Sequence, residues 1–164
     1  MPATYEPIAS ASPSAAANVT FSSIPGTFTD LVIVYSVTSS VGTEDMWLRY
    51  NNDTGSTNPY SATILSGTGS SAVSARLTNQ NKGLLDYYAI PGTSARATGV
   101  VQIMSYSNPN VFKTALSSAS RADAGVDRVV TLWRETTAAI TVVTLFTGSG
   151  TITGTVSLYG IKAA

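Results

Sequence analysis

The sequence contains no cysteine and no histidine, and only 11% of its 164 residues are charged. Without these two residue types, one chain cannot form a disulfide, a Cys/His zinc site, a cysteine nucleophile or a Ser-His-Asp triad. Nine basic residues balance nine acidic ones, and a neutral chain lacks the cationic excess on which binding to a phosphate backbone depends. These absences predict a protein with no cofactor, no nucleic-acid partner and no enzymatic activity.

Long apolar runs and targeting signals are also missing. The longest strongly apolar run covers residues 31–35, whereas a membrane-spanning helix needs roughly 18 apolar residues. The first basic residue is Arg49, so the N-terminus lacks the basic start of a secretory signal. We therefore expect a protein that is made in the cytosol and has no membrane partner.

The chain is instead rich in hydroxyl side chains and short strand-like stretches. It has 22 serines and 23 threonines, and 43% of its residues are hydrophobic. Threonine is β-branched and polar, so it suits the solvent face of a strand. Strand patterns separated by Gly, Pro and Asn turns recur at residues 19–24, 28–37, 45–50, 60–65, 70–77, 83–92, 100–107, 111–120, 126–133, 139–146 and 151–161. Nine to eleven strands at this spacing predict an all-β fold, an antiparallel jelly-roll-like β-sandwich.

The pattern divides the chain into two parts. Residues 1–18 are rich in Ala, Ser and Pro and have little to bury, which predicts a short extended N-terminal arm or a loosely held edge. Residues 19–164 are expected to form a single β-sandwich domain. Within it, the run at residues 31–35 is apolar at every position, which predicts a central strand covered on both faces.

Acidic residues offer few candidates for catalysis. Glu44 and Asp45 are adjacent before a strand, where neighbours face opposite ways, so we interpret them as a polar turn. Asp123 and Asp127 flank a turn that also carries arginines at 121 and 128, which predicts acid–arginine pairs. We therefore predict no catalytic residues.

The loop at residues 51–58 is dense in side-chain oxygens. Alternating oxygens with a glycine suit Ca²⁺, a hard ion with oxygen ligands, and Asp53 is the candidate ligand. The loop lacks the closing glutamate of an EF-hand, so a hairpin loop built from Asx turns is the favoured interpretation and no other metal site is predicted.

Some aromatic residues are candidates for binding a partner. Trp47 should face away from Met46, Leu48 and Tyr50 and share its face with Arg49, where an exposed ring would stack on a sugar or anchor an interface. The adjacent Tyr pair at 87 and 88 should point one ring each way. The full set of predicted partner-binding residues is Tyr5, Trp47, Arg49, Tyr60, Tyr87 and Tyr88.

Three segments together resemble a known family. They are FSSIPGTFTDLVI at 21–33, LRYNNDTGS at 48–56 and SLYGIKAA at 157–164, with a weaker match in QIMSYSN at 102–108. These segments resemble the small β-rich virion structural proteins of tailed bacteriophages of aquatic bacteria. The loop departs from the family in carrying Asn52 where the family has glycine, and the family supplies no catalytic residues to transfer.

The resemblance implies a virion structural protein. The first hypothesis is a capsid decoration (cement) protein on the outer shell, with the major capsid protein and further copies of itself as partners and a trimer as the expected oligomer. The alternative is a module of a tail fibre, spike or head fibre that binds host-surface carbohydrate through loops such as 51–59.

Overall fold

The protein is all-β and built from two antiparallel sheets, as the alternation predicts. The computed structural model describes residues 4–54 and 56–162. Within these ranges there is no helix, and hence none that could span a membrane. The strands are β1 (Tyr5–Ala11), β2 (Asn18–Phe21), β3 (Asp30–Ser39), β4 (Met46–Tyr50), β5 (Tyr60–Gly67), β6 (Ala72–Gln80), β7 (Gly83–Leu84), β8 (Ala97–Met104), β9 (Lys113–Arg121), β10 (Gly125–Trp133), β11 (Val143–Thr147) and β12 (Ile152–Ile161).

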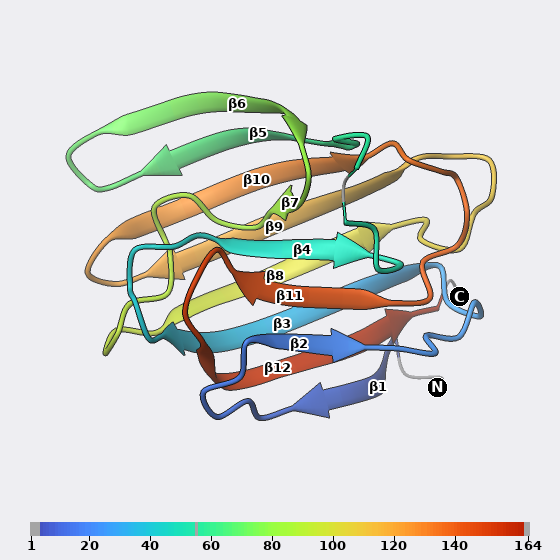
Figure 1. Ribbon diagram of the computed structural model, residues 1–164, viewed down its shortest axis with the longest axis horizontal. Helices are drawn as coiled ribbons and strands as arrows, with labels where there is room; N and C mark the ends of the chain where they lie inside the picture. The colour runs from blue at the N-terminus through green and yellow to red at the C-terminus, as the bar shows by residue number, and fades with distance from the viewer. Residues whose placement is uncertain (1–3, 55, 163–164) are drawn as a thin grey trace.

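The two sheets differ in size and lie face to face (Figure 1). The larger has eight strands in the order β1-β12-β3-β8-β9-β10-β5-β6, and the smaller has four in the order β2-β11-β4-β7. Every pairing is antiparallel, and β3 and β12 pair over their whole length, from Asp30↔Ile161 to Ser39↔Ile152. The described part of the chain therefore forms a β-sandwich, while its jelly-roll form stays a prediction.

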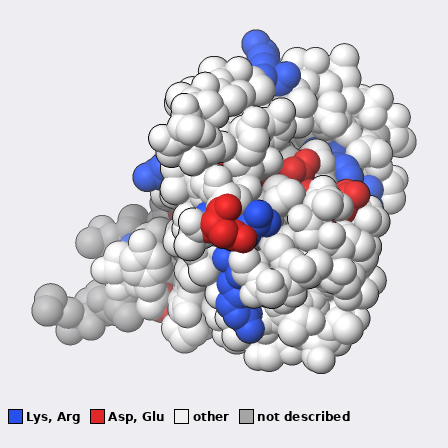
Figure 2. Space-filling model, turned by 90° about the vertical axis from the view of Figure 1, so that its left-hand side faces the viewer, with Lys and Arg blue, Asp and Glu red and all other residues white. Residues whose placement is uncertain are grey.

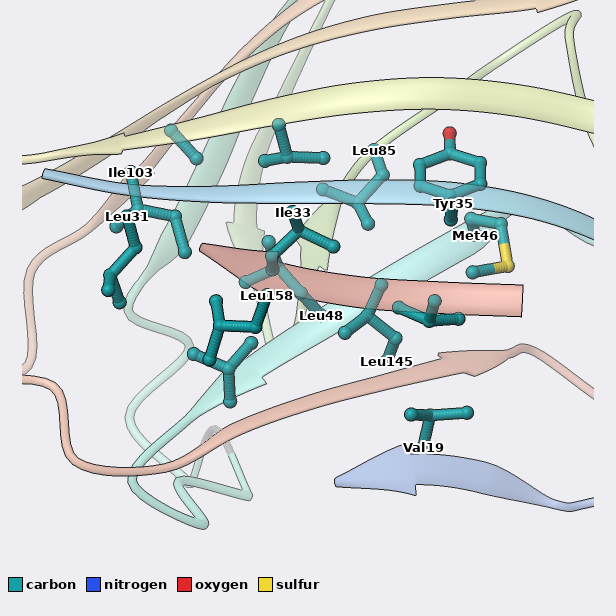
Figure 3. Packing of buried hydrophobic residues seen from close by; sticks show 14 of the residues in the cluster. Val19, Leu31, Ile33, Tyr35, Met46, Leu48, Leu85, Ile103, Leu145 and Leu158 are labelled. Carbon is teal, nitrogen blue, oxygen red and sulfur yellow. The ribbon is translucent and has the colours of Figure 1, made fainter. Parts of the chain in front are cut away.

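The core fills the space between the sheets. Ile33 from β3, Leu158 from β12, Leu48 from β4 and Leu145 from β11 are fully buried and belong to one cluster (Figure 3). These side chains alternate with outward-facing neighbours along each strand, because successive residues of a strand point to opposite faces. Burial of this shared layer is what holds the two sheets together.

Part of the predicted N-terminal arm is an edge strand. Residues 5–11 form β1, which pairs with β12 from Tyr5↔Ile161 to Ala11↔Val156, with a register shift between Pro7 and Ala9. Residues 1–3 of the predicted arm lie outside the described residues. The proline and the register shift suit the edge of a sheet, where one side of the backbone has no strand to pair with.

Two details of the predicted strands are wrong. The stretch at 83–92 was expected to be a strand, but only Gly83 and Leu84 pair, and the rest forms the connection from β7 to β8. Strand β3 is central, but it is not covered along its whole length on both faces: Val34 is 41% exposed, whereas Val32 on the same face is 4% exposed. A continuous apolar run here reflects an apolar surface on the uncovered side of the sheet, not burial on both sides.

Candidate functional site

Exposed aliphatic side chains gather on one surface of the molecule. We call this surface the outer face: the side of the eight-stranded sheet that points away from the four-stranded sheet. Along each strand, its residues alternate with those of the core. Seven large apolar residues of the outer face are between 40% and 60% exposed: Val34, Leu65, Val100, Met104, Leu116, Val126 and Val130.

The strand register places these side chains next to one another. Val34 pairs with Val100 across β3 and β8, and Leu116 pairs with Val130 across β9 and β10. With Leu65 on β5, the band crosses five neighbouring strands, or about 19 Å at roughly 4.8 Å per strand. Contiguous exposed apolar surface of this kind marks interaction sites in folded proteins.

Hydroxyl groups separate the aliphatic side chains. Two shallow hollows of about 360 and 430 Å³ lie side by side on the outer face and share Ser118 and Ser120 in their walls. Arg128, on the same face, lines the larger one. The outer face therefore combines aliphatic and hydroxyl side chains. Figure 2 looks onto the end of the sandwich where the β5–β6 and β9–β10 hairpins turn, and there acidic and basic groups gather near the middle of the view among uncharged residues.

A second group of side chains lies on the opposite side of the sandwich, on β4 and β11. Trp47 and Arg49 share a face of β4, as alternation predicts. The Lys82 ammonium lies 4.1 Å from the centre of the Trp47 ring, and the Arg49 guanidinium lies 4.7 Å from the centre of the Phe146 ring. Such contacts stabilise a cation by about 0.5–2 kcal/mol each. They also cover Trp47, which is 8% exposed, so its ring is not an open stacking platform.

The charged groups around Trp47 have shifted pKa values. Burial, followed by the positive charge of Arg49, lowers the pKa of Lys82. Burial, followed by the negative charge of Glu44, raises the pKa of Asp45 to about 6. The interpretation of Glu44 and Asp45 as a polar turn before a strand fits their position, but Asp45 is half-buried there.

Two carboxyl groups are buried between the sheets. Asp127 on β10 accepts hydrogen bonds through Oδ2 from the backbone N–H groups of residues 87, 88 and 89, at 2.8, 2.9 and 2.7 Å. Asp86 accepts a hydrogen bond through Oδ1 from the N–H of Met46 at 2.9 Å, and burial raises its pKa well above the usual range. Together they tie the β7–β8 connection to β10 and β4.

The same layer contains unpaired polar atoms. The Tyr35 hydroxyl, Asp86 Oδ2 and Asp127 Oδ1 are buried without a hydrogen-bond partner. Burial, with the nearby charges of Asp86 and Asp127, raises the pKa of Tyr35 well above its usual value. A neutral tyrosine and a neutral Asp86 are the forms that this environment favours.

The acid–arginine pairs predicted near the β9–β10 turn are half right. Arg121 Nε donates to Asp123 Oδ1 at 2.7 Å. Asp127 is instead buried, at 2% exposed, and holds the three N–H groups described above. Strand alternation separates Asp127 from Arg128, because Asp127 points into the sandwich and Arg128 points out of it.

The predicted partner-binding tyrosines lie in different environments. Tyr60 is fully buried, and its hydroxyl accepts a hydrogen bond from the backbone N–H of Tyr50 at 3.0 Å. Tyr87 and Tyr88 are not in a strand; they are half-buried and meet edge to face, with ring centres 5.0 Å apart. The expectation of one ring on each side of a strand is therefore wrong. Tyr5 is 55% exposed on the edge strand β1.

The calcium candidate Asp53 is engaged in a different contact. Its Oδ2 accepts a hydrogen bond from the indole N–H of Trp133 at 2.6 Å. Among the described residues there is no group of three or more Asp, Glu, His or Cys side chains that could hold a metal ion, while Gly55 of the same loop lies outside them. The contact with Trp133 ties the loop to the core.

Sequence reasoning missed the outer face and the buried carboxyls. The signal for the outer face was present in the sequence: β3, β8 and β10 have apolar residues at both odd and even positions, as in residues 31–35, so both faces of these strands carry apolar side chains. No comparable signal marks Asp127, because the residues whose N–H groups it binds lie about 40 positions away.

Comparisons with known proteins give few matches. No family model matches the chain, and no curated protein matches it either. A solved structure of alginate lyase Aly36B in complex with an alginate tetrasaccharide is similar to it with 10% identity and a TM-score of 0.31, covering 84% of this chain and 72% of the lyase. A second structure of the same lyase has 8% identity and a TM-score of 0.29, covering 79% and 69%.

These comparisons contradict two expectations. The similar structures are those of an enzyme, and this finding corrects both of them. The first is the prediction of a phage virion protein, either a capsid decoration protein or a fibre module. The second is the prediction of no enzymatic activity. The absence of His, of Cys and of a placed carboxylate pair does not exclude catalysis, because lysine and tyrosine also transfer protons. One fold also hosts many functions. TM-scores near 0.3 carry no argument for a particular activity. The major capsid protein as partner, the virion location and the trimer stay predictions.

Proposed function

We propose that the protein is an assembly module that associates with a second copy of itself through the outer face of the eight-stranded sheet. The observation that supports this proposal is the concentration of exposed aliphatic side chains there. Val34, Val100, Leu116 and Val130 form two neighbouring cross-strand pairs in the middle of that sheet. Burying them against a like surface would remove apolar area from water, at about 25 cal/mol per Å².

A second copy is the partner that suits this chemistry. Hydroxyl groups such as those of Ser118 and Ser120 both donate and accept hydrogen bonds, so a hydroxylated face is complementary to itself. Arg128, on the same face, can donate to the hydroxyl oxygens opposite.

The outer face also has the area that a stable interface needs. Eight strands at about 4.8 Å spacing and about eight residues per strand give a footprint of roughly 34 by 26 Å. That is close to the area of about 800 Å² per partner in standard protein interfaces. Two copies packed through the same surface form a two-fold symmetric dimer, whereas the trimer expected from the sequence would need two different contact surfaces.

The oligomeric state in solution tests the proposal. Sedimentation equilibrium of the whole chain should show a concentration-dependent dimer. Val100→Lys and Leu116→Lys should each weaken it at least tenfold, because each buries a cation in an apolar contact. The matched control is Val41→Lys, which changes an aliphatic residue of similar exposure, 38%, in the β3–β4 connection.

Two results would contradict the proposal. One is a chain that stays monomeric at millimolar concentration. The other is an oligomer that both outer-face lysine variants leave intact, because the contact would then lie elsewhere. Circular dichroism of each variant confirms that the β-sandwich has formed.

A further inference from the structure

A polar hollow lies on the exposed side of the four-stranded sheet, across the sandwich from the outer face. It has a volume of about 290 Å³ and is lined by Asn18, Thr20, Arg49, Asn52, Thr54 and Thr144. The register sets Arg49, Thr144 and Thr20 side by side on β4, β11 and β2. The wall is completed by Asn18 of β2 and by Asn52 and Thr54 of the β4–β5 loop.

Arg49 is the charged group of this hollow. Its guanidinium rests on the Phe146 ring, which holds the group in place without using its N–H donors. Its Nε is buried and has no hydrogen-bond partner. The ion pairs found in the described part of the chain are Arg121–Asp123 and Lys162–Glu6, so neither neutralises Arg49.

A second cation lies against the same aromatic ring. Lys82 shares the aromatic surface, with its ammonium 5.9 Å from the centre of the Phe146 ring, and the charge of Arg49 contributes to lowering the Lys82 pKa. The acids that act on Lys82, Glu44 and Asp45, precede β4, whereas Arg49 lies near its end. An anion bound at Arg49 would therefore relieve an unpaired donor and a repulsion between two cations.

The other walls of the hollow select for hydroxyl groups. The hydroxyls of Thr20 and Thr144 are 3.0 Å apart and form one polar pair, and Thr20 also donates to Asn18 Oδ1 at 3.4 Å. Side-chain amides and hydroxyls recognise ligand hydroxyls, and a guanidinium recognises a carboxylate through two parallel hydrogen bonds. With about 290 Å³, the hollow lies at the lower end of the volumes of small-molecule sites, so it has room for one small ligand.

We propose that this hollow binds a small hydroxylated carboxylate, of the size of one sugar acid, with its carboxylate on Arg49 and its hydroxyls on the Thr20–Thr144 pair. The proposal does not rest on self-association, because the two surfaces are on opposite sides of the sandwich. A substitution in one leaves the other unchanged.

Calorimetric titration of the whole chain tests the proposal, with sodium glucuronate as the probe and glucose as the uncharged control. Glucuronate should bind saturably with a millimolar dissociation constant, and glucose at least tenfold more weakly. Arg49→Gln should weaken glucuronate binding about ten- to a hundredfold, because it removes the charged donor. Thr144→Val, which keeps the shape of the side chain, should weaken it severalfold.

The control variant is Arg76→Gln, which removes an exposed arginine from the edge strand β6 of the other sheet and should leave glucuronate binding unchanged. Tryptophan fluorescence confirms that each variant is folded. The proposal is overturned if wild-type protein does not bind glucuronate, if Arg49→Gln binds it as well as wild type, or if glucose binds equally well.

Discussion

Asp127 is the residue whose replacement should most destabilise the sandwich. Its Oδ2 accepts hydrogen bonds from three consecutive backbone N–H groups of the β7–β8 connection. Asp127→Ala removes the acceptor and leaves three donors without a partner. The connection cannot supply another acceptor, because its backbone is held in place by Asp86 and the Tyr87–Tyr88 contact.

The magnitude follows from the burial of the three donors. An unpaired buried donor costs about 1–3 kcal/mol. Ala89 is fully buried, so leaving its N–H without an acceptor has the full cost. Tyr87 and Tyr88 are half-buried, so water can partly replace the lost acceptor there and the cost is lower. We expect Asp127→Ala to lower the free energy of unfolding by about 3–5 kcal/mol, which combines one full cost for Ala89 with two partial costs for Tyr87 and Tyr88. Asp127→Asn keeps one oxygen acceptor and should cost about half as much.

Urea unfolding followed by tryptophan fluorescence measures this loss, since Trp133 is in the core. The control is Asp123→Ala, which removes an exposed acid from the same turn, and its ion pair with Arg121 contributes about 0–1 kcal/mol. If Asp127→Ala and Asp123→Ala differ by less than 1 kcal/mol, the reasoning from the three hydrogen bonds is refuted.

Two further substitutions test other parts of the structure. Burial raises the folded pKa of Asp45 to about 6, so its contribution to stability is present below about pH 4 and is lost as the pH rises through 6. Asp45→Asn should therefore be more stable than wild type at pH 7 by about 1–2 kcal/mol after allowance for solvent screening, and no more stable at pH 4. Urea unfolding at both pH values measures the two differences in the free energy of unfolding. An equal difference at pH 4 and pH 7 would exclude the Asp45 pKa as the cause. Gly99→Ala would place a Cβ 2.3–2.5 Å from atoms of the Tyr35 side chain. The overpacking should lower the free energy of unfolding by about 1–3 kcal/mol, which thermal unfolding detects as a lower midpoint. Gly67→Ala, where the nearest atom is 3.9 Å away, is its control, and equal midpoints for the two would show that the Tyr35 ring moves freely.

The sequence by itself determined the properties that depend on local geometry. The all-β class follows from alternation and turn residues, which act over a few positions. The shared face of Trp47 and Arg49 likewise follows from the two-residue period of a strand. The sequence could also exclude disulfides and histidine chemistry, because these depend only on composition.

Only the tertiary structure decided which faces are covered. The four-stranded sheet combines β2, β4, β7 and β11, from four distant parts of the chain, and it covers one face of the larger sheet. Val34 is exposed and Tyr60 is buried for this reason, although both are apolar or aromatic residues of a strand. Asp127 and the unpaired guanidinium of Arg49 depend on the same packing, because their neighbours are distant in sequence. Local patterns carry no record of these contacts, since the folded chain alone brings the neighbours together.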